Sequence, residues 1–153
     1  MAQGLQPMSS KAMGKGDTDS HRYICRHSLI IGLAVAMMLV LVCWIFTGDI
    51  VNFFNSEQSA ELAERAELGL RLYSLGFIMA AVNIVRSGYF GAIGMANKCA
   101  LISILRGVVA IVIFVIILPL IVGELGVWLA FPAAEVFTFV VSLVAYRDIS
   151  TVS

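Results

Sequence analysis

Four long apolar runs alternate with short polar segments along the chain, and this pattern predicts membrane-spanning helices. The hydrocarbon core of a bilayer is about 30 Å thick, so a helix needs roughly 20 mostly apolar residues to cross it. The runs that meet this requirement are residues 28–46, 72–93, 99–122 and 127–146. Prolines within the last two runs are compatible with spanning, because neighbouring helices can satisfy the carbonyls that proline frees. The sequence therefore predicts an all-α integral membrane protein with four transmembrane helices.

Residues 49–71, which connect the first two runs, have a different character. Glutamates recur there every three or four residues, at Glu57, Glu61, Glu64 and Glu67. Arg65 and Arg71 each follow a glutamate by four residues, a spacing that stabilises an exposed helix. We predict a water-exposed helix, capped by Ser56, that leads directly into the second span. Its acidic face is interpreted either as a solvated surface or as a vestibule that attracts cations.

Composition supports the membrane assignment and excludes other classes. Hydrophobic residues make up 60% of the chain and charged residues only 13%, whereas about half of an ordinary soluble domain is apolar. The net charge is zero, so the basic footprint of a nucleic-acid partner is missing. No histidine, cysteine or serine set has the spacing of a metal site or a nucleophilic array. We therefore expect no enzyme activity, no catalytic residue, no metal and no bound cofactor.

Basic residues are concentrated in the segments that would lie on one side of the membrane. Six fall on that side and two on the other, namely Lys11, Lys15, Arg22, Arg26, Lys98 and Arg147 against Arg65 and Arg71. The positive-inside rule then places both termini in the cytoplasm and the acidic connector outside, in a multi-pass protein of the cell (plasma or inner) membrane. Residues 1–27 are expected to be the end of a preceding helix and a cytoplasmic loop, residues 28–147 the membrane region and residues 148–153 a cytoplasmic tail.

Three ionisable side chains, Arg86, Arg106 and Glu135, lie inside the apolar runs. A charge at membrane depth costs at least a few kcal/mol unless it is paired or hydrated. Counted at about 1.5 Å per residue, both arginines lie about 12 Å deep and the glutamate about 18 Å. We hypothesise that Glu135 pairs with Arg106, because consecutive helices usually pack side by side. Such a pair would either fix the register of the two helices or exchange protons during transport. A third possibility is that the charge partners of these residues lie in segments missing from this chain.

The second span also carries a polar stripe at three- and four-residue spacing, which lies on one helix face. Met79, Asn83 and Ser87 belong to this stripe and are candidates for lining a substrate cavity. Hydrogen bonding to a neighbouring helix is the alternative explanation for the polar members.

Short motifs along the chain carry a family resemblance through their order and spacing. They are Gly4-Leu5-Gln6-Pro7 with the following GKGD, Phe46-Thr47-Gly48-Asp49, Gly91-Ala92-Ile93-Gly94, Ser103-Ile104-Leu105-Arg106, and Gly126-Val127-Trp128-Leu129-Ala130 with Glu135. With these motifs in this order, the chain resembles part of the multidrug and toxic compound extrusion (MATE) family. The resembling part is the end of the family's eighth helix and its ninth to twelfth helices.

The resemblance implies a partial C-terminal lobe of a twelve-helix transporter. Members of that family export organic cations and other amphipathic compounds in exchange for Na⁺ or H⁺. The resemblance adds Gln6 to the candidates for substrate or cavity contacts. Some members place an acidic cation-site residue in the tenth helix, where this chain has only Asn83 and Arg86, so an aspartate-dependent Na⁺ site is not expected here.

The sequence thus predicts a part of a cation-coupled multidrug antiporter that is inactive alone. Its expected partners are the lipid bilayer, a small organic substrate and, if they are separately encoded, the missing N-terminal helices. Two alternatives stay open. One is a small four-helix transporter acting as a dimer, with Glu135 as its essential carboxylate, and the other is an assembly subunit that does not transport.

Overall fold

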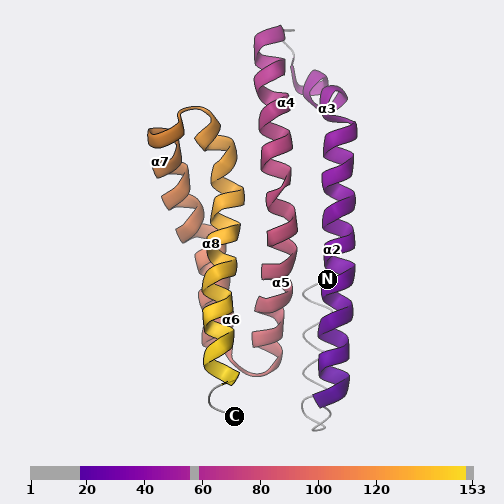
Figure 1. The fold of residues 1–153 in the computed structure, drawn as a ribbon, viewed down its shortest axis with the longest axis vertical. Coiled ribbons are helices and arrows are strands. Elements are labelled where there is room, and N and C mark those ends of the chain that lie inside the picture. Colours follow the sequence, from indigo (N-terminus) through magenta and orange to yellow (C-terminus); the bar gives the residue numbers. More distant parts are fainter. Residues whose placement is uncertain (1–17, 56–58, 151–153) are drawn as a thin grey trace.

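The computed structural model describes residues 18–55 and 59–150. Regular structure in these ranges is helical throughout, and the helices form four long rods that run alternately up and down (Figure 1). In chain order they are α2 (Thr18–Ile45), α3 (Thr47–Phe54), α4 (Ala60–Ser74), α5 (Gly76–Ala92), α6 (Ala96–Ile104), the π-helical turn η1 (Leu105–Val109), α7 (Ala110–Val122) and α8 (Leu125–Ser150).

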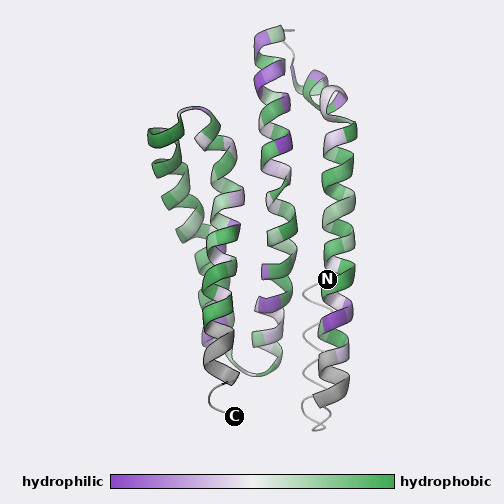
Figure 2. Ribbon diagram, viewed as in Figure 1, coloured by the Kyte–Doolittle hydropathy of each residue, from purple (hydrophilic) through white to green (hydrophobic). Residues whose placement is uncertain are grey.

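Four stretches of helix are long and apolar enough to cross a membrane, which confirms the predicted fold class. They are Tyr23–Ile45, Ala60–Ala92, Ala96–Val122 and Leu125–Val144. Figure 2 shows hydrophobic colouring along most of α2, α7 and the described part of α8, whereas hydrophilic residues gather on α4. Large apolar side chains remain exposed on α7, including Ile116, Leu120 and Ile121, as expected of a surface in contact with lipid.

The second rod is longer than a membrane crossing requires. Its 33 residues, Ala60–Ala92, correspond to a helix of about 50 Å, against a hydrocarbon core of about 30 Å. α4 accordingly carries the charged residues of the connector and extends past the turn between α7 and α8 (Figure 1).

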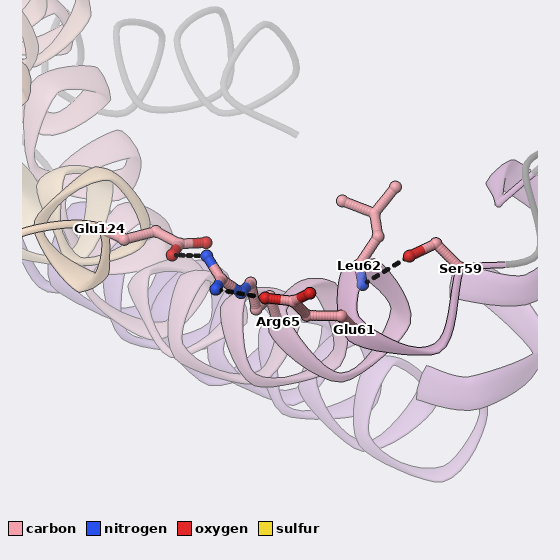
Figure 3. Close-up of polar contacts among 5 residues, drawn as sticks. All are labelled: Ser59, Glu61, Leu62, Arg65 and Glu124. Carbon is pink, nitrogen blue, oxygen red and sulfur yellow. Dashed lines mark hydrogen bonds and ion pairs between the residues drawn. The ribbon is translucent and has the colours of Figure 1, made fainter.

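The N-terminus of α4 is capped differently from the sequence prediction. Ser59 is the N-cap, and its hydroxyl accepts a hydrogen bond from the Leu62 amide at 3.4 Å (Figure 3). The assignment of this role to Ser56 was therefore wrong, and Ser56 itself lies outside the described residues. The reason is that α4 begins at Ala60, one turn later than the first glutamate of the acidic series suggested.

Arg65 connects α4 to the turn between α7 and α8. Its guanidinium donates to Glu61 at 2.7 Å, four residues earlier, and to Glu124 at 2.5 Å (Figure 3). About half of the Arg65 side chain is exposed, so solvent screening keeps the contribution of these pairs small. The Glu124 pair joins the α7–α8 turn to α4, whereas the Glu61 pair lies within α4.

Glycines allow α8 to approach the second rod closely. A Cβ atom added at Gly69 would lie 2.2 Å from the Trp128 ring, and one at Gly76 would lie 2.5 Å from the Phe131 ring. The Phe131 ring also stacks on Tyr73, with 4.5 Å between the ring centres. Small residues that admit a neighbouring helix are the usual means of close packing in membranes. Here each glycine receives an aromatic ring from α8.

The contact between α2 and α5 is looser. An open apolar groove of about 310 Å³ runs between these helices, with Gly32, Ala36, Ala80 and Ala81 among its lining residues. Next to this contact, the Trp44 indole of α2 donates to the buried hydroxyl of Ser74, the last residue of α4, at 3.2 Å. A Cβ atom added at Gly32 would only reach ordinary contact with Val85, at 3.6 Å. This contact therefore leaves room that the α8 contact does not.

Candidate intramembrane polar site

Glu135 is the one buried carboxylate among the residues that the structure describes. It lies on α8 with 2% of its surface exposed. Asn83 of α5, which is fully buried, donates its amide Nδ2 to Glu135 Oε2 at 2.8 Å and to the Glu135 main-chain oxygen at 2.9 Å. One amide group thus holds both the side chain and the backbone of Glu135, which joins α5 to α8 in the middle of the membrane region.

Arg106 approaches the same carboxylate from the third rod. Its Nη1 lies 3.6 Å from Glu135 Oε1, too far for a good hydrogen bond but close enough for strong electrostatic attraction. The Arg106 side chain is 31% exposed, whereas that of Glu135 is 3% exposed. The carboxylate therefore receives a close neutral partner and a more distant charged one.

Arg106 belongs to the π-helical turn η1, which interrupts the regular helix between α6 and α7. A π turn widens the helix because each amide bonds to the carbonyl five residues earlier. Such turns are often found at functional sites. This turn is not predictable from the sequence, since no residue type identifies a π turn.

Arg86 has a different partner from Arg106. Its guanidinium donates to the Ser142 hydroxyl at 2.9 Å, and its central carbon lies 4.7 Å from the centre of the Phe139 ring. Both partners lie further along α8 than Glu135. Ser142 is fully buried and donates in turn to the Phe139 carbonyl at 2.8 Å. A hydroxyl and an aromatic face thus stabilise this second intramembrane cation.

The remaining predicted candidates lie apart from the polar site. Ser87 turns toward α6, with its hydroxyl 2.9 Å from the Ser103 hydroxyl and 3.3 Å from the Cys99 carbonyl oxygen. Met79 is half-buried on α5. Neither these two nor Asn83 line the groove between α2 and α5. Gln6 lies outside the described residues, and the role of all four in substrate contact stays a prediction.

Sequence reasoning missed two buried hydroxyls of α8, Thr138 and Ser142. Thr138 donates to the Ala134 carbonyl of its own helix at 2.8 Å. A signal was present, because residues 135, 138 and 142 are separated by three and four positions and so lie on one helix face. That spacing marks the face of α8 that packs inward.

The site has one acceptor without a partner. Asn83 Oδ1 is buried and accepts no hydrogen bond from any described residue. An unsatisfied polar atom in a low-dielectric interior is costly. Within residues 18–55 and 59–150, no group of three acidic, histidine or cysteine side chains could hold a metal ion. The arrangement is suited to holding a negative charge or a proton on Glu135.

Comparison with known proteins identifies the family. A sequence model of the MatE family matches residues 1–116. An outward-facing structure of a multidrug resistance MATE family transporter of the MOP superfamily shares the fold with a TM-score of 0.85 and 20% identity, over 98% of this chain and 34% of that one. An inward-facing structure with the same description gives a TM-score of 0.87 and 19% identity, over 98% and 35%.

No curated protein sequence matches the chain significantly. The chain spans about a third of the length of the solved transporters that share its fold. The family match covers most of the sequence, and the four membrane helices superpose on part of those transporters. The chain therefore belongs to the MATE family of membrane transporters, which are not enzymes.

Proposed function

We propose that the chain forms part of a cation-coupled antiporter that exports amphipathic organic compounds in exchange for Na⁺ or H⁺. The observation that carries this proposal is the fold match over 98% of the chain to multidrug transporters in both outward- and inward-facing conformations. The TM-scores of 0.85 and 0.87 are nearly equal, so the corresponding part of those transporters has a similar shape in both structures. In the complete transporter, this segment would move largely as a rigid unit.

The chain alone is proposed to be inactive. Alternating access requires two halves that close around a site between them. The matched structures are about three times as long as this chain, and the additional helices would supply the second half and part of the first. The polar site at Glu135 lies within one half, where it joins three helices, and it would be completed as a coupling site only in the assembled transporter.

We also propose an orientation with both termini in the cytoplasm and α4 on the outer side of a plasma or inner membrane. The excess of basic residues near the termini, together with Lys98 in the first turn of α6, supports it. Single cysteines at Glu124 and at Lys98, in a variant without the native cysteines, test this in intact cells. An impermeant thiol reagent should label the first and not the second, and the reverse result would overturn the orientation.

Reconstitution tests the transport proposal. Purified chain is placed in lipid vesicles with and without helices equivalent to the missing part of the matched transporters, and efflux of an ethidium-type dye is measured under imposed Na⁺ or H⁺ gradients. We expect efflux only with the added helices and only under one of the gradients. Gradient-driven efflux by the chain alone would instead support a small dimeric transporter. Binding to the added helices without efflux would support a non-transporting assembly subunit.

A further inference from the structure

The partners of Glu135 differ in what they can do with a proton. An arginine side chain has hydrogen-bond donors and no acceptor, so Arg106 can bind a charged carboxylate but cannot accept a hydrogen bond from a protonated one. An asparagine amide has both functions. Asn83 at present donates through Nδ2 to Glu135 Oε2, while its Oδ1 is buried and accepts nothing from the described residues. The unused acceptor therefore lies on the same amide group that already holds the carboxylate.

We propose that Glu135 binds and releases a proton, and that Asn83 positions it in both states while Arg106 binds only the charged state. In the charged state, Nδ2 donates to Oε2 and Arg106 is attracted to Oε1. When a proton from water forms an O–H bond on the carboxylate, the neutral acid donates to Asn83 Oδ1. Because Oδ1 and Nδ2 share one carbon, rotation of the amide brings Oδ1 beside Oε2 without moving α5, and it gives up the hydrogen bond from Nδ2 to the Glu135 main-chain oxygen.

Release of Arg106 is the mechanical consequence. Its contact with Glu135 is 3.6 Å long and depends on charge, whereas the Asn83 contact is 2.8 Å long. The Arg106 side chain is 31% exposed, so it can turn to water once the attraction is lost. η1 would then separate from α8 while α5 remains attached. The π-helical turn, which is already the irregular part of the third rod, is the segment that gains freedom.

Other charges around Glu135 are few. α5 contributes Arg86, which donates to Ser142 of α8, and α6 contributes Lys98, eight positions before Arg106. α7 (Ala110–Val122) contains no charged residue, and Glu135 is the only charged residue of α8 between Leu125 and Val144; Arg147 and Asp148 lie near the C-terminal end of α8. On α4, Arg65 and Arg71 pair with glutamates of the connector. Arg106 is therefore the cation whose interaction depends directly on the charge of Glu135.

This inference rests on the proposed cation coupling for its use in transport, but it can be tested on the chain alone. Hydrogen–deuterium exchange is measured in lipid nanodiscs for the natural chain and for Glu135→Gln, in which an uncharged amide imitates the protonated acid. We expect exchange at Leu105–Val109 to become about threefold faster, because losing one polar contact between membrane helices lowers the free energy of local opening by about 0.6 kcal/mol. Exchange in α5 around Asn83 should be unchanged. Equal acceleration in both segments, or none in η1, would overturn the proposal.

Three further variants separate positioning from general loss of stability. Asn83→Leu should accelerate exchange in α5 as well as η1, because it removes the contact common to both states. Arg106→Gln should make exchange in η1 insensitive to Glu135→Gln. Thr138→Val is the matched control, since Thr138 is a buried hydroxyl of the same helix face that bonds only to Ala134 and should leave η1 unchanged. Acceleration of η1 by the control equal to that by Glu135→Gln would count against a specific role of Glu135.

Infrared difference spectroscopy reports the proton itself. Lowering the pH should produce the carbonyl band of a protonated carboxyl that is absent in Glu135→Gln and shifted in frequency in Asn83→Leu, because the hydrogen bond to the amide is lost. If no such band depends on Glu135, the inference fails even where the assembled transporter exports dye. If the band is present but the assembled transporter exports nothing, the proposed function fails and the proton site stands.

Discussion

The second rod packs against α8 on one side and against α2 on the other, and the two contacts are built differently. Toward α8, four specific contacts follow one another along the two helices. They join Gly69 to Trp128, Gly76 to Phe131, Asn83 to Glu135 and Arg86 to Ser142. Toward α2, mainly apolar side chains of mixed size line a groove of about 310 Å³, and one hydrogen bond joins Trp44 to Ser74.

The difference shows where the specificity of this bundle lies. The α8 contact combines two glycine–aromatic contacts with two polar ones, so a shift along the helix axis would break all four. The α2 contact presents mainly methyl and methylene groups, for which many positions are nearly equivalent. In lipid, apolar side chains gain little by meeting each other rather than the acyl chains, so fit and hydrogen bonds decide the packing. We expect mutations to separate the two contacts by size of effect.

The largest effect is expected for Gly76→Val. The new Cβ would lie 2.5 Å from the Phe131 ring and 3.2 Å from the Pro132 backbone, so the ring must turn out of its stacked position on Tyr73 or α8 must move away. Overpacking of this kind costs about 1–3 kcal/mol of unfolding free energy. Thermal or denaturant unfolding in detergent, followed by circular dichroism, measures the loss. If Gly76→Val unfolds no earlier than the natural chain, the close approach of α8 is not a determinant of stability.

A double-mutant cycle sharpens the same contact. Gly69→Ala places a methyl group against the Trp128 ring and should destabilise the bundle, whereas the loss should be smaller in a Trp128→Leu background, where the ring is gone. Residues in direct contact typically show coupling energies of about 0.5–3 kcal/mol. Additive losses would mean that the ring and the glycine do not meet.

A smaller effect is expected for Ser142→Ala, which removes the hydroxyl that accepts from Arg86. Hydrogen bonds between membrane helices contribute about 0.6 kcal/mol on average. The Phe139 ring, 4.7 Å from the Arg86 guanidinium, still stabilises the cation in this variant. Phe139→Leu in the same background should therefore add a second loss in the unfolding experiment. If neither change lowered the unfolding free energy, the contacts of Arg86 with Ser142 and Phe139 would not stabilise the bundle.

The smallest effect is expected for Gly32→Ala on the α2 side. The added methyl group would meet Val85 at 3.6 Å and Ala81 at 3.9 Å, which are ordinary contact distances. The change in unfolding free energy should stay within about 0.5 kcal/mol, the range of substitutions that disturb no specific feature. A loss as large as that of Gly76→Val would show that both contacts are equally tight, and the comparison would fail.

The membrane spans were predictable from sequence because hydropathy is a property of each segment taken alone. Proximity of Arg106 to Glu135 was also within reach of sequence reasoning, since the third and fourth rods are consecutive in the chain. The hydrogen bonds from Asn83 to Glu135 and from Arg86 to Ser142 were not, because they join the second rod to the fourth. Nothing local to Asn83 indicates which helix packs beside it.

The same limit explains the glycine contacts. Gly69 stands in a charged amphipathic stretch, and only the position of Trp128, 59 residues later, gives it a structural purpose. The N-cap prediction was wrong for a different reason. Ser56 and Ser59 both precede acidic residues that favour a helix N-terminus, and the choice between them depends on where the preceding chain from α3 joins α4.

The π-helical turn at Leu105–Val109 has a consequence for how related sequences are read. A π turn holds one residue more than an α-helical turn, so every side chain from Ala110 onward is rotated by about 100° relative to an unbroken helix. An ungapped alignment with a relative that lacks the turn would equate lipid-facing positions of α7 with inward-facing ones. The proper place for a one-residue gap is inside this membrane helix, beside Arg106, rather than in a loop.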